Sequence, residues 1–288
     1  MGLFNSYTKE GKGVEKNAMR PIRPLYFFEL FWRKFWNLIQ MNLLYAVITL
    51  PIWILVALFV FNDQTLNNFS LEFTGGFLFW LAIVFIALSW LIGPATAGMT
   101  YVLKCFATET PVFRFSDFFE QFRKNFKQST VMSIINGVFL LSFSLTLTQG
   151  NTLLFGNSDL TLSAMRLPLL IINLILILVN YYAYSIMVMF QLKLSDLIKN
   201  AFIFALAKLP LNLLILALVC VICYFSYYYL FIGFLLTIII LYAFCGFLVV
   251  FSVYPTLEKH MLIPAQKLEK IDDNKNEKEN FENDSEKI

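Results

Sequence analysis

Long runs of apolar residues, separated by short polar stretches, set the pattern of this chain. Six runs are long enough to cross a hydrocarbon core of about 30 Å as helices, since each helical residue adds about 1.5 Å. The predicted spans are residues 37–61, 75–105, 129–148, 167–192, 209–227 and 230–254. The pattern therefore predicts an all-α polytopic membrane protein with six transmembrane helices.

Between the second and third spans, residues 114–128 carry aromatic side chains at helical spacing. The polar face includes Arg123 and Lys124, and Ser116 or Asp117 can cap the start by accepting a hydrogen bond from a free backbone N–H. We expect this amphipathic helix to lie in the membrane–water interface with its basic side toward the cytosol. Its apolar face consists of Phe115, Phe118, Phe119, Phe122 and Phe126.

Related aromatic and basic segments precede two other spans, at residues 25–36 and 193–208. Each is followed by two apolar runs, so the chain can be read as three parallel hairpin repeats that start near Pro24, Arg114 and Lys193. An alternative interpretation stays open, because any six-span protein with both ends on one side forms three hairpins. Aromatic and basic residues also gather at every cytosolic interface.

The fourth span carries a stripe of polar side chains at helical spacing, because positions 7, 11 and 18 residues after the first share one face. Amides facing lipid would be costly, so we expect the stripe to face other helices or a cavity. Two functions fit: hydrogen bonding between helices, or the lining of a solute path with facing residues such as Asn42 and Asn136. The stripe consists of Asn173, Asn180, Tyr184 and Gln191.

Small residues recur along one face of the second span. Gly93 and Ala97 form a small-xxx-small pair, which lets a neighbouring helix backbone come close. Ser89 and Thr96 share this face, and Pro94 lies in the same turn. We therefore expect this face to pack against another helix and Pro94 to bend the span.

Composition agrees with a membrane protein. Hydrophobic residues make up 59% of the chain and charged residues 14%, against about 25% charged in soluble domains. Outside the tail, fifteen Lys and Arg residues fall in predicted cytosolic segments and one, Arg166, on the other side. This distribution places both termini in the cytoplasm and the protein in the cell membrane. The predicted domains are a cytosolic segment at 1–24, the membrane domain at 25–254 and a disordered cytosolic tail at 255–288.

The predicted spans contain few residues that could carry out catalysis or bind a metal. No predicted span has an Asp, Glu, Lys, Arg or His near its middle, and the one histidine, His260, lies outside the spans. Phosphate-binding loops and metal-ligand motifs are absent, and the Cys220-x-x-Cys223 pair lies in an apolar helix. We therefore expect no catalytic residues, no metal, no cofactor and no nucleic-acid partner; the protein is predicted not to be an enzyme.

Several stretches resemble a known family. The opening Met1-Gly2-Leu3-Phe4-Asn5, the run 93–104 (GPATAGMTYVLK) and the pattern Phe115-x-Asp117-Phe118-Phe119-x-x-Phe122-x-x-Asn125-Phe126-Lys127-Gln128 are similar to the YesL family of Gram-positive integral membrane proteins. The resemblance covers roughly residues 1–254, although members are typically shorter than this chain. It implies an accessory role in carbohydrate import and supplies no catalytic residues, since none is known in the family.

Two functional hypotheses follow. The first is an accessory or scaffold component linked to carbohydrate uptake, whose amphipathic helices contact the lipid bilayer and subunits of a sugar importer. The alternative is a facilitator of a neutral small solute, lined by the polar stripe of the fourth span. An intramembrane enzyme has the least support. The sequence leaves the oligomeric state open.

Overall fold

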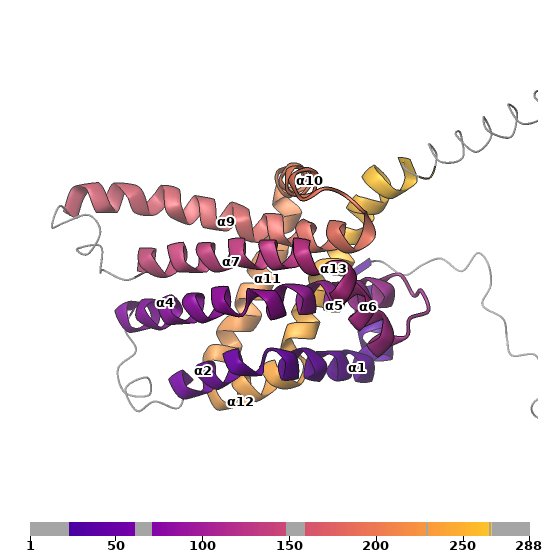
Figure 1. Ribbon diagram of the computed structural model, residues 1–288, viewed down its shortest axis with the longest axis horizontal. Helices are drawn as coiled ribbons and strands as arrows, with labels where there is room; N and C mark the ends of the chain where they lie inside the picture. Colours follow the sequence, from indigo (N-terminus) through magenta and orange to yellow (C-terminus); the bar gives the residue numbers. More distant parts are fainter. Residues whose placement is uncertain (1–22, 61–70, 148–158, 229, 265, 267–288) are drawn as a thin grey trace, which may run out of the picture. The chain divides into compact units, whose positions relative to one another are not determined.

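The structure is a computed structural model that describes residues 23–60, 71–147, 159–228, 230–264 and 266. This part of the chain is helical and has no strand, so the all-α prediction is confirmed there (Figure 1). The α-helices are α1 (Arg23–Ile48), α2 (Leu50–Val60), α4 (Leu71–Ala87), α5 (Ser89–Ala107), α6 (Arg114–Lys124), α7 (Phe126–Leu147), α9 (Asp159–Met189), α10 (Leu194–Ala207), α11 (Leu209–Tyr228), α12 (Leu230–Leu236) and α13 (Tyr242–Leu257). Two π-helical turns, η1 (Thr237–Leu241) and η2 (Glu258–Leu262), precede and follow α13.

The chain divides into two compact units, Met1–Phe35 and Trp36–Ile288. The boundary that the sequence predicts at residue 24 separates a cytosolic segment from the membrane domain and is a different division of the chain. In the described part of the first unit, aromatic side chains one helical turn apart pack on each other: the Phe31 ring lies 6.4 Å from that of Phe27 and 5.7 Å from that of Phe35. Such pairs are worth about 1 kcal/mol beyond the area they bury.

In the second unit, α7 packs against α4, α5 and α9, and α5 also packs against α6 and α13. Tyr182, Ala183 and Ile186 on α9 are fully buried, and so are Leu197 and Ala201 on α10. These residues share helical faces, because positions three and four apart are neighbours on a helix. The core of this unit therefore forms around the second half of α9.

Two predicted spans are interrupted. The first breaks at Thr49 between α1 and α2, as expected from Pro51, whose ring nitrogen has no hydrogen to bond the preceding turn. The second breaks at Leu88, where α4 and α5 meet with a bend of 82°. The sequence predicted a bend at Pro94 instead. Pro94 lies inside α5, whereas at the break the Ser89 hydroxyl donates to the Phe85 carbonyl, a bond that competes with regular helix geometry.

The last span contains a π-helical turn that one side chain from α1 holds. The Asn42 Nδ2 donates to the carbonyls of Thr237 and Ile238 at 2.9 and 2.6 Å, and its Oδ1 accepts from the Ala243 N–H at 2.7 Å. A π turn leaves backbone groups without regular partners, and such groups are costly away from water. Asn42 supplies those partners from a buried position.

Two helix ends differ from the sequence prediction. The amphipathic helix predicted over 114–128 ends at Lys124, and α7 begins at Phe126, because the Asn125 side chain bonds back to Gln121 and competes with the helix. The last span, predicted to end at residue 254, does not end before Pro255. Pro255 lies inside α13, and helix continues through Leu262, so this part of the predicted disordered tail is helical. Residues 267–288 of that tail lie outside the described residues.

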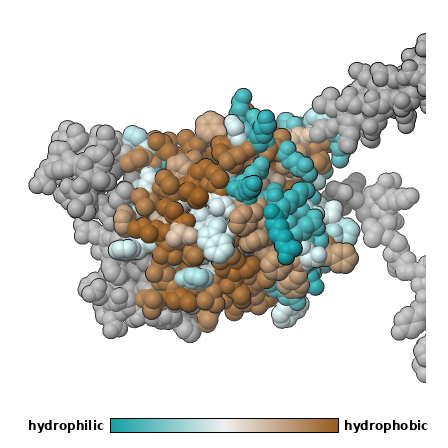
Figure 2. Space-filling model, in the orientation of Figure 1, coloured by the Kyte–Doolittle hydropathy of each residue, from teal (hydrophilic) through white to brown (hydrophobic). Residues whose placement is uncertain are grey.

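Several helices are long and apolar enough to cross a membrane. Within the described residues these are Pro168–Met189, Leu209–Ser226 and Ile232–Leu262, and the count is four if the bent pair Phe79–Ala87 and Ser89–Ala107 forms one span. The predicted first and third spans are not among them. On the face drawn in Figure 2, hydrophilic residues gather around α6, and hydrophobic residues cover the helices beyond it. These features are those of a multi-pass membrane protein.

Candidate functional site

Two cavities of the second unit share the same two amide side chains. One, of about 360 Å³, lies among α1, α5, α7, α9 and α13, and the other, of about 200 Å³, lies between α7 and α9. Asn136 of α7 and Asn180 of α9 line both cavities. The larger volume is in the range of small-ligand pockets.

Asn136 lies near the middle of α7, and Asn180 lies near the middle of Pro168–Met189, the apolar segment of α9. Asn136 is ten residues after Phe126, where α7 begins, and Asn180 is nine residues before Met189, where α9 ends. At about 1.5 Å per residue, each amide is about 14–15 Å from that end of its helix, which is about half of a hydrocarbon core. The smaller cavity continues from the amides to Phe143 and Asn173, toward the other ends of both helices.

Asn136 and Asn180 each have a buried carbonyl oxygen without a hydrogen-bond donor among the described residues. The Nδ2 of Asn180 is occupied, since it donates to the Leu176 carbonyl at 2.9 Å. A buried acceptor without a donor costs about 1–3 kcal/mol. Both residues line the same two cavities, so two acceptors without a donor lie beside this space.

The remaining wall of the larger cavity combines aromatic rings with aliphatic side chains. Tyr45 stacks on Tyr242 with the ring centroids 4.3 Å apart, and the Tyr45 hydroxyl lies 3.1 Å from the Thr96 Oγ1. Tyr181 and Tyr184 complete this wall on the α9 side. Among the described residues, no Asp, Glu, Lys, Arg or His lines either cavity. The site can bind a neutral polar molecule through ring faces and hydrogen bonds, but it offers no carboxylate, imidazole or amine for acid–base chemistry.

The predicted polar stripe is only partly brought together. Asn180 and Tyr184 line the larger cavity, and Asn173 lines the smaller one. The Asn173 Nδ2 donates to the Leu169 carbonyl at 2.9 Å and lies 3.5 Å from the Ser142 Oγ. Gln191 does not belong to the stripe, because α9 ends at Met189 and Gln191 is exposed in a different cleft.

The facing residues proposed from the sequence have different roles. Asn136 lies in the site, whereas Asn42 is occupied by the π-helical turn described above. Tyr45 and Tyr242 were not singled out, because a tyrosine in an apolar run does not show from sequence which helix its ring will face. Their only signal is a hydroxyl in a predicted span, where such a group needs a partner.

The small residues of α5 lie at a close helix crossing. Ser89, Gly93 and Ala97 are buried, and a Cβ atom on Gly93 would overlap the Ser129 carbonyl of α7. Thr96 lines the larger cavity instead, and its hydroxyl donates to the Ile92 carbonyl of its own helix at 2.8 Å. The crossing of α5 and α7 therefore fixes the positions of Thr96 and Asn136 in the same cavity.

The five phenylalanines of the predicted amphipathic face do not act as one surface. Phe118 is fully buried and packs against Gly98 of α5, whereas Phe115 and Phe119 are 50% and 42% exposed. Phe122 is half-buried, and Phe126 belongs to α7 and is exposed. The two cations predicted on the polar face, Arg123 and Lys124, are exposed.

The start of α6 is held in two ways. Asp117 accepts a hydrogen bond from the backbone N–H of Phe113 at 3.0 Å, which occupies a free donor at the start of the helix. Arg114, the first residue of the predicted amphipathic helix, donates through Nη1 to the side-chain oxygens of Asn37, at 2.6 Å, and of Gln40. These bonds attach α6 to the adjoining part of α1.

Among the residues that the structure describes, no group of side chains forms a metal site. No three His, Cys, Asp or Glu side chains there come close enough to hold an ion. Cys220 and Cys223 are exposed on α11, so their spacing does not make a closed site.

Comparisons with known proteins identify one family match. A family model described as "Protein of unknown function, DUF624" matches residues 73–146, about a quarter of the chain. The matched segment contains Gly93, α6 and Asn136, but not α9 or α13, which provide the other walls of the cavities. Neither the curated proteins nor the solved structures gave a match.

Proposed function

We propose that the protein is a multi-pass membrane protein that binds a small neutral solute within its membrane domain and facilitates the passage of that solute. The observation that carries the proposal is the pair of unpaired carbonyl oxygens of Asn136 and Asn180, where two cavities meet near the middle of the helices. A solute with hydroxyl groups would donate to both oxygens, and the tyrosine rings would contact its apolar faces.

The chemistry of the walls limits the solute class. Without a charged lining residue, an ion would lose its hydration without an opposite charge in return. A neutral polyol or sugar has several hydroxyl donors and suits two amide oxygens. The proposal therefore agrees with the link to carbohydrate uptake that the resemblance to the YesL family implies.

The transmembrane arrangement that we propose has six spans with both termini in the cytoplasm. The supporting features are the helix pairs α1–α2, α4–α5 and α12–α13, the single helices α7, α9 and α11, and the excess of Lys and Arg on one predicted side. The three helix pairs would each count as one interrupted span. This topology would accommodate a threefold repeat of parallel hairpins, with α6 and α10 as the amphipathic helices of the second and third units.

An accessory role is the second candidate, and the exposed aromatic residues at the start of α6 favour it. Phe113, Phe115 and Phe119 are exposed, as are Arg123 and Lys124, which is the composition of a surface that contacts lipid or a partner subunit. In this role the protein would bind subunits of a sugar importer. The two cavities would then be gaps in the helix packing that bind no solute.

The two candidates are separated by a transport measurement on purified protein in vesicles. Osmotic swelling with glycerol, a pentose and a hexose would be compared between the unaltered protein and the double variant Asn136→Leu and Asn180→Leu. We expect the variant to lower the solute-dependent swelling rate at least about fivefold, since each lost hydrogen bond is worth about 1 kcal/mol.

The control is Asn200→Leu, which removes an amide on α10 whose hydrogen bond is exposed and stays within its own helix. The same preparations would be tested for thermal stability, which should not fall in the double variant because unpaired oxygens are removed. Swelling that is equal in the unaltered protein, the double variant and empty vesicles would overturn the facilitator proposal and leave the accessory role.

A further inference from the structure

A separate cleft of about 690 Å³ lies between the α6–α7 junction and the carboxyl end of α9. It is lined by residues 121 and 123–128 from one side and 187–193 from the other. These segments lie where α7 begins and where α9 ends, whereas the amides of the first site lie near the middle of the same helices. The cleft shares no lining residue with the two cavities described above.

Four basic side chains line the cleft, and no acidic one from the described part of the chain does. They are Arg123, Lys124, Lys127 and Lys193. The carboxyl end of α9 contributes about half a negative charge, which the four cations exceed. The cleft is therefore strongly positive.

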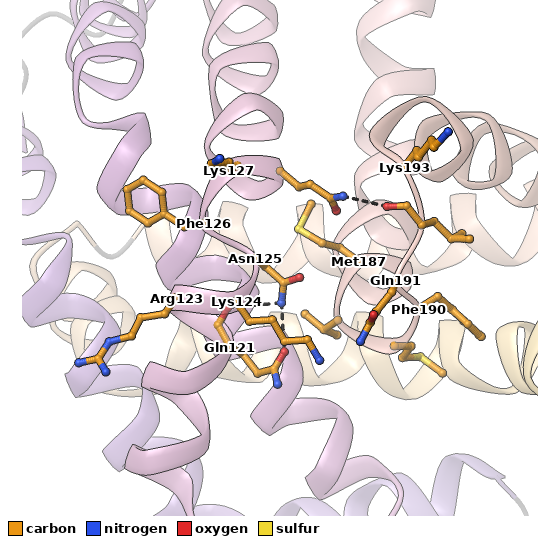
Figure 3. A pocket seen from close by; sticks show the side chains of 14 residues that line it. Gln121, Arg123, Lys124, Asn125, Phe126, Lys127, Met187, Phe190, Gln191 and Lys193 are labelled. Carbon is orange, nitrogen blue, oxygen red and sulfur yellow. Dashed lines mark hydrogen bonds between the residues drawn. The ribbon is translucent and has the colours of Figure 1, made fainter.

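Neutral donors supplement these cations. Gln121 and Asn125 are buried in the wall, and the Asn125 Nδ2 donates to the Gln121 Oε1 at 3.0 Å. This bond orients the Gln121 amide so that its NH₂ group stays available as a donor. In Figure 3, Lys124 and Gln191 extend toward each other across the cleft, while Arg123 points away from its middle.

The far wall is fixed in place by two hydrogen bonds. The Gln128 Nε2 donates to the Leu192 carbonyl at 2.8 Å, and the Phe190 N–H donates to the Ile186 carbonyl at 2.8 Å. The segment 190–193 therefore keeps its position relative to α7, although it is not helical. Gln191 and Lys193 therefore extend from a backbone segment whose place beside α7 is held.

We infer that this cleft binds the phosphate of an anionic phospholipid headgroup. Phosphate is the group that several cations and amide donors recognise together, and basic pockets between helices near the membrane surface recognise lipid headgroups. The apolar part of the lining, including Val188, Phe190 and Phe126, offers a surface for the start of an acyl chain. This apolar wall favours a lipid over free phosphate as the source of the group.

Lipid binding at this cleft is independent of transport through the first site. It would be tested with the full chain in a neutral detergent, using phosphatidylglycerol with a fluorescent acyl chain as the probe. The test variant is Lys124→Gln, Lys127→Gln and Lys193→Gln together. The matched control is Lys104→Gln, Lys199→Gln and Lys208→Gln, which removes the same charge from residues outside the cleft.

We expect the test variant to bind the probe at least about tenfold more weakly, because charge-assisted bonds to the phosphate are lost, and the control to bind as the unaltered protein does. Gln191→Leu, a change at an exposed and uncharged position, should weaken binding severalfold. This single variant still tests the inference if the triple variant does not fold. Equal losses in the test and control variants, or no loss in Gln191→Leu, would overturn the inference. Displacement of the lipid by inorganic phosphate would assign the site to free phosphate and reject the lipid.

Discussion

Polar side chains buried among apolar helices fall into two kinds in this protein. Asn42 bonds the backbone of the last span through both its Nδ2 and its Oδ1, whereas Asn136 and Asn180 each keep an oxygen without a donor among the described residues. The first kind stabilises the fold, because it serves backbone groups that water cannot reach. The second kind lowers stability, and under the proposed function these oxygens would serve to bind the solute.

The π-helical turn at Thr237–Leu241 should depend on the Asn42 side chain. We expect Asn42→Leu to lower the free energy of unfolding by about 2 kcal/mol, since three hydrogen bonds are lost and backbone groups stay unpaired. Unfolding in mixed micelles with increasing denaturing detergent would measure the change. Asn200→Leu serves as the control, and a loss of the same size in both variants would contradict the role assigned to Asn42.

The crossing of α5 and α7 should tolerate no side chain at Gly93. A Cβ atom there would overlap the Ser129 backbone, which cannot move without displacing α7. We expect Gly93→Ala to lower the thermal midpoint clearly, by several degrees. Gly246→Ala should have a smaller effect, because its Cβ would lie 2.9 Å from the flexible end of Leu103. If Gly246→Ala proved the more damaging of the two in a melting experiment, the close crossing would not be the determinant.

At the scale of the helix, α6 shows how one aromatic pattern serves two purposes. Phe118 faces α5 and is fully buried, while Phe115 and Phe119 are exposed. The inward face is defined by contact with Gly98, where the absence of a side chain leaves room for the ring. Spacing alone predicts an amphipathic helix, but not which phenylalanines pack against the protein and which stay on its surface.

This division predicts different results for two substitutions in α6. Phe118→Ala should destabilise the protein by about 3–5 kcal/mol, because it opens a cavity under the helix. Phe119→Ala should change stability by less than about 1 kcal/mol and instead weaken contact with lipid or a partner. Hydrogen exchange of the α6 amides, measured in detergent, would report the first effect. Equal exchange rates in the two variants would show that Phe118 does not hold the helix.

At the scale of the whole molecule, the proposed topology predicts where a reagent can reach the chain. In a cysteine-free background, the variant Asn68→Cys should react with an impermeant thiol reagent on intact cells. The variant Lys199→Cys, on α10, should react only after the cells are broken, because we place α10 in the cytoplasm. The opposite pattern would invert the proposed orientation, and labelling of neither position on intact cells would reduce the number of spans.

The extent of the membrane domain was predictable to a large degree. Apolar run length alone placed α11 and the apolar segment Pro168–Met189 of α9 to within a few residues, whereas α9 begins earlier, at Asp159, and the last span continues beyond Pro255. The interruption at Leu88 was not predictable, because the bond from Ser89 to the Phe85 carbonyl has a spacing that is ordinary in any helix. The π turn at Thr237–Leu241 was not predictable either, because its partner, Asn42, comes from α1 and is distant in the sequence. Asn180 and Tyr184 could be proposed as a site because amides and hydroxyls are rare in apolar spans.

The sequence by itself determined the class of this protein. The hydrocarbon core sets a minimum length of apolar helix, so runs without charge predict helices of that kind wherever they occur. Only the tertiary structure decided the sites. Whether a buried asparagine bonds to another helix, as Asn42 does, or leaves an oxygen open in a cavity, as Asn136 and Asn180 do, depends on which groups the packed helices bring within hydrogen-bonding distance.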